Sequence, residues 1–208
     1  MSQANMNNDI NDDYSKILSE ILNKVFLFEI DNDIYYSKNH LCFQKTDENI
    51  FIVGFDSYIT NLLSFINAIV LTSINEPIFE GKPFGWLVQN GKTFSIYSPV
   101  NAVIYEQNMN IVDKPDSLRN RKFPDNWFVK LKFQDKKDTL KLMQGKIAEI
   151  WYERINKKLK NEIINILKES HPKELITQFD GGKFIYSITE ILPSNERIKI
   201  ISDMLLIR

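Results

Sequence analysis

The stretch FGWLVQNGKTFSIYSPV, from Phe84 to Val100, decides how this chain folds. Two runs of aromatic and β-branched residues flank the dipeptide Asn90-Gly91. Asn-Gly is the strongest short signal for a two-residue hairpin turn, because both central residues of a type I′ turn need a positive φ. The sequence therefore predicts a β-hairpin with Asn90 and Gly91 at its tip, and with Lys92 opening the returning strand.

Short apolar runs of the same kind continue on both sides of this hairpin. They are separated by Gly, Pro, Asn and Asp, which is typical of many short strands in a small barrel or sandwich. A short helix is expected within residues 57–67. The predicted strands are Ile34–Tyr36, Leu41–Gln44, Ile50–Val53, Ile69–Ser73, Trp86–Gln89, Thr93–Tyr97, Ala102–Gln107 and Trp127–Phe133.

Helical periodicity flanks this β-rich centre. A stripe from Tyr14 to Val25 predicts an N-terminal helix, and apolar residues at spacings of three and four predict helix from about residue 140 to Ser170. Gly145 is expected to divide the second region into two helices. Residues 176–188 suggest a hairpin, and a helix beginning at Ser194 competes with a strand there, because Ile198 and Ile200 also alternate.

The hairpin and the segments around it resemble the glycine cleavage system H protein family. That family's hairpin reads roughly F-G-x-x-E-S-x-K, then a few small or polar residues, then an aliphatic residue followed by Y-[AS]-P-V. Further similar segments follow in family order over residues 34 to about 152: Tyr36–His40, Ile52–Tyr58, Glu80–Gly85, Pro99–Asn108, Pro115–Leu118 and Asn126–Leu131.

The resemblance implies an α+β fold whose β-rich centre is a barrel-sandwich hybrid of the lipoyl type. We expect a disordered tail over 1–12, an N-terminal helix and linker over 13–33, an H-protein-like domain over 34–152 and a helical and hairpin extension over 153–208.

The family's lipoyl-bearing lysine aligns with Gly91, and Lys92 lies one residue beyond it. The glutamate that the family places three residues before its lysine aligns with Val88. The favoured interpretation is a non-catalytic H-like subunit that carries no cofactor and acts as a binding or scaffold component. The alternative is a working carrier that holds lipoate on Lys92 through a shifted hairpin.

Protein partners are expected in either case. The resemblance points to enzymes of glycine cleavage, such as the aminomethyltransferase, to lipoate metabolism, or to a related redox complex. The hairpin supplies the interaction candidates Trp86, Asn90, Lys92 and Phe94, because an exposed aromatic pair beside the turn would anchor a partner.

Composition excludes several other classes of function. A formal net charge of −1 argues against an electrostatic nucleic-acid binder. Cys42, the single cysteine, rules out an internal disulfide and a cysteine-based zinc site, and it is expected to be a buried apolar side chain. His40 and His171 form no metal-ligand pattern, and His40 is expected to be structural.

No stretch reaches the roughly 20 apolar residues of a membrane span. The polar N-terminus does not resemble a secretory signal, so a cytoplasmic protein is expected.

Overall fold

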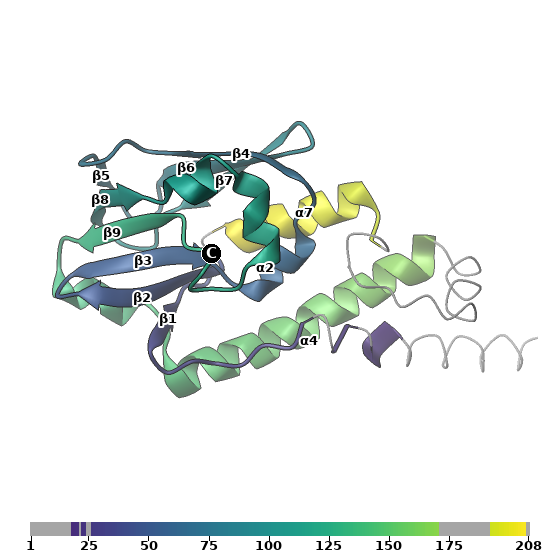
Figure 1. Cartoon of the computed structure of the whole chain (residues 1–208). Coiled ribbons are helices and arrows are strands. Elements are labelled where there is room, and N and C mark those ends of the chain that lie inside the picture. The colour runs from purple at the N-terminus through teal and green to yellow at the C-terminus, as the bar shows by residue number, and fades with distance from the viewer. Residues whose placement is uncertain (1–17, 21, 24–25, 171–191, 207–208) are drawn as a thin grey trace, which may run out of the picture.

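The computed structural model describes residues 18–20, 22–23, 26–170 and 192–206. It contains two antiparallel sheets with helices packed against them (Figure 1). The expected α+β class with a β-rich centre is therefore confirmed. The tail over 1–12 and the hairpin over 176–188 lie outside the described residues.

The larger sheet has six strands. In spatial order they are β1 (Ile34–Tyr36), β2 (Leu41–Asp47), β3 (Ile50–Phe55), β9 (Val129–Phe133), β8 (Ala102–Gln107) and β5 (Pro77–Ile78). From Phe51 onward every residue of β3 is buried. Gly54 is required there, because an added Cβ would lie 2.5 Å from Oδ1 of Asn126. The central strand thus lies in a closely packed interior, which explains its nearly continuous apolar sequence.

The smaller sheet has three strands and contains the hairpin. Its order is β4 (Ile66–Leu71), β6 (Pro83–Gln89) and β7 (Lys92–Tyr97). Helix α2 (Ser57–Leu62) precedes it and is shorter than expected, because the chain leaves the helix at Leu63 and enters β4 three residues later. Apolar residues that the sequence assigned to one helix therefore divide between a helix and a strand.

Two short helical segments follow β8, and a third precedes the long C-terminal helix. They are α3 (Met109–Val112), the 3-10 helix η1 (Pro115–Asn120) and the 3-10 helix η2 (Lys136–Lys141). The long helix α4 (Gly145–Ser170) has no interruption. Gly145, with φ 53°, marks the expected division, because α4 begins there and the short helix η2 lies before it.

Helix α4 lies along one side of the molecule and packs onto the sheets with its apolar stripe (Figure 1). Trp151, Tyr152, Leu159, Ile163 and Leu167 are buried on that stripe. The apolar stripe of this helix is therefore covered by its own chain.

The chain's two ends contribute to the same core. Leu18 and Leu22 are fully buried, so these two residues of the predicted N-terminal stripe face the interior, as does Phe26 after it. The C-terminal segment, for which the sequence allowed either a helix or a strand, forms helix α7 (Ser194–Leu205). This helix buries Ile201 and Leu205. It lies between α4 and the three-stranded sheet (Figure 1).

Candidate functional site

The hairpin tip has the predicted geometry. Asn90 has φ 48° and Gly91 has φ 72°, and Gln89 pairs directly with Lys92. Positive φ at both central residues is the signature of a type I′ turn. Nothing lies within 4 Å of a Cβ placed on Gly91, so this position faces open space at the apex.

Hydrogen bonds hold the tip against the loop after α2 and the start of β4. The Asn90 amide N–H donates to Oδ1 of Asn67 at 2.9 Å, and its side-chain Nδ2 donates to Oγ of Ser64 at 2.9 Å. The Ser64 N–H in turn donates to Oε1 of Gln89 at 2.8 Å. Gln89 is only 1% exposed, so this hydrogen bond satisfies a buried polar side chain. The tip is therefore attached to the body of the protein, and the role of Asn90 within the chain is to anchor it.

The two faces of the hairpin differ in burial. Leu87 pairs with Phe94, and both point inward and are buried. Trp86 pairs with Ser95 on the outer face and is half-buried. The expected exposed pair of Trp86 and Phe94 is therefore wrong. When Asn90 and Gly91 are the two turn residues, Gln89 pairs with Lys92, and the pairing continues one residue at a time along both strands. The Asn-Gly signal therefore already predicts the pairs Leu87–Phe94 and Trp86–Ser95.

The outer face is apolar around Trp86. Its neighbour across the sheet is Val70, which is 51% exposed, and Val88 lies two residues further along the same strand. Trp86, Val70 and Val88 together define what we call the outer patch.

Lys92 is exposed, and it occupies the first position of β7 rather than the apex. Alternation along the strand places it on the same side as Phe94, whose side chain points inward. The alignment inferred from the sequence puts the family's modified lysine at Gly91, and a glycine has no amine to acylate. On that alignment the residues at the apex do not fit a lipoyl group.

A buried polar cluster connects α4 to the sheets, and sequence reasoning missed it. Asp56 caps α2 by accepting from the Ile59 N–H at 3.1 Å, and Oδ2 of Asp56 lies 2.6 Å from Nδ1 of His40. The Tyr152 hydroxyl donates to the same Oδ2 at 2.7 Å. Because a carboxylate only accepts, Nδ1 of His40 is the donor in this cluster.

Burial determines the properties of this cluster. Asp56 is 1% exposed and His40 2% exposed, and burial together with the Asp56 charge raises the pKa of the Tyr152 hydroxyl well above its usual value. His40 also adopts a left-handed backbone with φ 62°, which is uncommon for a residue other than glycine. The expectation that His40 is structural agrees with these contacts. Asp56 caps α2 and is buried.

Cys42 is 2% exposed, and burial raises the pKa of its thiol well above its usual value. The expected role as a buried apolar side chain agrees with both observations. Among the described residues no group of three or more His, Cys, Asp or Glu side chains could hold a metal ion. In that same part of the chain, no helix has the length and apolarity that crossing a membrane requires.

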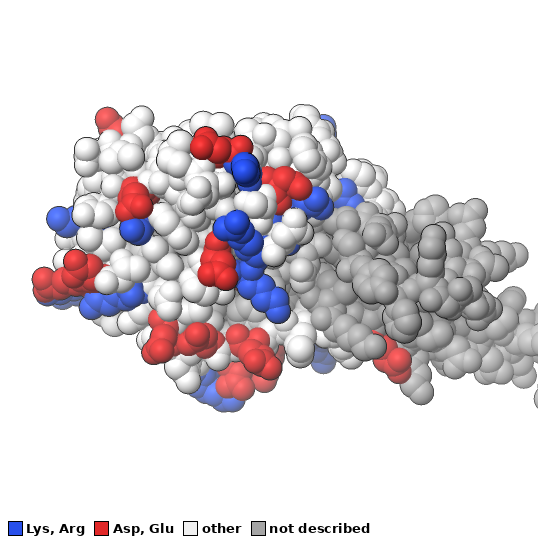
Figure 2. All heavy atoms as spheres, viewed as in Figure 1, with Lys and Arg blue, Asp and Glu red and all other residues white. Residues whose placement is uncertain are grey.

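Charges of both signs are interspersed on the face shown in Figure 2. Several form pairs, such as Lys130 with Glu106 at 2.6 Å and Arg119 with Asp116 at 2.7 Å. This face presents no continuous basic surface of the kind that contacts nucleic-acid phosphates.

Comparison with known proteins identifies the family. The family model of the glycine cleavage H-protein matches residues 34–158. The glycine cleavage system H protein of Staphylococcus saprophyticus is 28% identical over 117 residues, covering 56% of this chain and 91% of that protein. The protein of the same name from Staphylococcus epidermidis is 30% identical over 107 residues, covering 51% and 83%.

A solved structure shows the same fold. The crystal structure of a glycine cleavage system H protein from Mycobacterium marinum superposes with a TM-score of 0.50 at 18% identity, covering 61% of this chain and 98% of that chain. The residues that the family model matches include the hairpin, the His40–Asp56–Tyr152 cluster and the first half of α4. The chain belongs to the glycine cleavage H-protein family.

Proposed function

We propose that this protein is an H-like subunit that works without a lipoyl group, as a protein-binding or scaffold component of a multi-enzyme or redox complex. The observation that carries the proposal is the apex of the hairpin. Gly91 stands where the family resemblance places the modified lysine, in a left-handed backbone conformation that a lysine would adopt only at a cost.

The neighbouring lysine is a poor substitute for the missing one. Lys92 belongs to the paired strand opposite Gln89, which is held in place by Ser64. A lipoyl-attaching enzyme that reads the apex of a hairpin would find the Lys92 amine displaced by one residue and emerging from the inward-facing side. Val88, at the position of the family's glutamate, removes a second recognition feature.

Without a lipoyl group, the protein would act through a surface that binds a partner, and we propose that this surface is the outer patch. Trp86, Val70 and Val88 lie on one face of a paired sheet, and a half-buried tryptophan among aliphatic side chains is a common interface anchor. The relatives are named as H proteins of the glycine cleavage system, so the enzymes of that system or their relatives are the proposed partners. No catalytic role is proposed.

Intact mass of the protein purified from its own cells tests the missing lipoyl group. Lipoylation adds about 188 Da, the mass of lipoate less one water. We expect the unmodified mass. The matched variant is Val88→Glu combined with Gly91→Lys, which restores both family features and is expected to accept lipoate from a lipoate ligase. A lipoyl group on Lys92 of the natural protein would show that the carrier alternative is correct.

Binding measurements test the outer patch. Trp86→Ala is expected to weaken binding to an aminomethyltransferase from the same cells, measured by calorimetry with purified proteins. Tyr105→Ala is the control, because Tyr105 is 49% exposed on the other sheet. Equal effects of both changes, or no effect of the first, would contradict this placement of the interface.

A further inference from the structure

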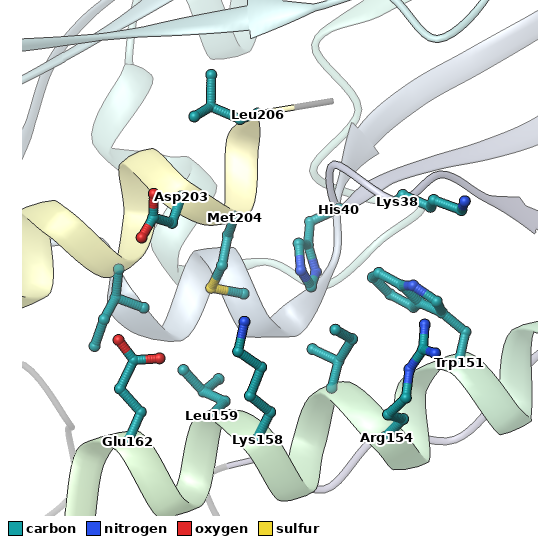
Figure 3. Close-up of a pocket in the computed structure, with 12 residues that line it drawn as sticks. Lys38, His40, Trp151, Arg154, Lys158, Leu159, Glu162, Asp203, Met204 and Leu206 are labelled. Atoms are coloured by element: carbon teal, nitrogen blue, oxygen red, sulfur yellow. The ribbon is translucent and has the colours of Figure 1, made fainter. Parts of the chain in front are cut away.

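A pocket of about 280 Å³ lies between α4, α7 and the turn that precedes β2 (Figure 3). One part of its wall, including His40 and Trp151, comes from the region matched to the H-protein family. The other part, including Leu159 and Met204, comes from residues beyond that region. The pocket exists because the C-terminal extension packs on the family fold, so it is independent of the function proposed above.

Three basic side chains line this pocket, from its middle to one end. Arg154 and Lys158 project from α4 toward α7 and His40, and Lys38 lies beyond Trp151 (Figure 3). None of these three forms an ion pair within the part of the chain that the structure describes. Arg154 and Lys158 are four residues apart on a helix, where like charges repel each other. An anion between them would relieve that repulsion.

The acidic residues of the pocket lie elsewhere. Glu162 and Asp203 are at the end opposite Arg154 and Lys38 in Figure 3. Glu162 is four residues beyond Lys158 on α4, so it offsets part of the Lys158 charge, whereas both acidic side chains of the lining lie away from Arg154 (Figure 3). An anion would therefore bind at the Arg154 end.

The rest of the wall is apolar. Trp151, Leu159 and Ile200 are buried and face this space together with Met204. His40 adds one polar atom: Asp56 fixes Nδ1 as the donor, and Nε2 has no hydrogen bond within the described part of the chain. A neutral His40 can thus accept a hydrogen bond from a ligand through Nε2.

We propose that this pocket binds a small carboxylate with an apolar body. The carboxylate lies between Arg154 and Lys158, where each cation donates charge-assisted hydrogen bonds. The apolar body contacts Trp151, Leu159 and Met204. The volume is just below the usual range for small-molecule sites, so the pocket fits a short acyl chain or a single aromatic ring.

Titration of the full-length, ¹⁵N-labelled protein with hexanoate tests this proposal. The indole N–H signal of Trp151, assigned through Trp151→Phe, is expected to shift and to saturate at one ligand per chain. Hexan-1-ol, which lacks the charge, and inorganic phosphate, which lacks the apolar body, are expected to cause no saturable shift.

Exposed residues on α4 provide matched variants that should leave the fold intact. Arg154→Gln and Lys158→Gln are each expected to weaken hexanoate binding at least tenfold, whereas Lys157→Gln, one residue away and outside the pocket, is expected to leave it unchanged. Unchanged melting temperatures confirm that the variants are folded. Absence of a saturable shift, equal binding of hexan-1-ol or phosphate, or equal losses in all three variants would each overturn the proposal.

Discussion

Removing the Asp56 carboxylate is expected to destabilise this protein far more than removal of an ordinary helix cap. Asp56 accepts three hydrogen bonds in the interior, from the Ile59 N–H, His40 Nδ1 and the Tyr152 hydroxyl. Loss of an N-cap costs about 1 kcal/mol. Each buried donor left without a partner costs about 1–3 kcal/mol more. Asp56→Ala should therefore lower the free energy of unfolding by roughly 3–7 kcal/mol.

Urea denaturation followed by circular dichroism measures this change, with Asp135→Ala as the matched control. Asp135 also caps a helix, accepting from the Lys137 N–H at 2.8 Å, but it lies at the exposed start of η2 and holds no buried partner. Its loss should cost only about 1 kcal/mol.

Tyr152→Phe separates the contribution of the Tyr152 hydrogen bond from that of the packing of its ring. It removes one hydrogen bond while keeping the ring that stacks on Phe28 at 4.1 Å, so its cost should fall between those of Asp56→Ala and Asp135→Ala. If Asp56→Ala and Asp135→Ala prove equally costly, the buried cluster does not stabilise the packing of α4 as argued.

Three further outcomes are expected. Phe94→Ala should destabilise the protein by about 3–5 kcal/mol because the ring is 4% exposed, whereas Trp86→Ala should cost much less in the same unfolding assay. Cys42 should react with iodoacetamide only after denaturation, since burial raises the pKa of its thiol and blocks access; rapid labelling of the native protein would contradict this. The hydrogen bond from Arg119 lowers the pKa of Asp116, so this pair stabilises the protein above the ordinary carboxyl pKa and ceases to do so as pH falls through the lowered value. Arg119→Gln should therefore cost up to about 1 kcal/mol at neutral pH and nothing at strongly acidic pH; a constant difference across pH would exclude the ion pair as the cause.

Local signals in the sequence were sufficient for the hairpin and most of the strands. Asn90-Gly91 determines a type I′ turn because few other residue pairs tolerate positive φ at both positions. The turn also determines the register, so the burial of Phe94 followed from the sequence even though we expected that ring to be exposed. The family resemblance likewise rests on short motifs whose order and spacing are visible along the chain.

Only the tertiary structure shows features that depend on contacts between residues far apart in the chain. Asp56 looks like a turn residue in sequence. It is instead the buried N-cap of α2, and its burial depends on Tyr152, which lies 96 residues away in the chain. The pocket beside His40 likewise requires α4 and α7 to pack on the same turn. No local pattern encodes such contacts, because periodicity shows that a helix has an apolar face but not which surface will cover that face.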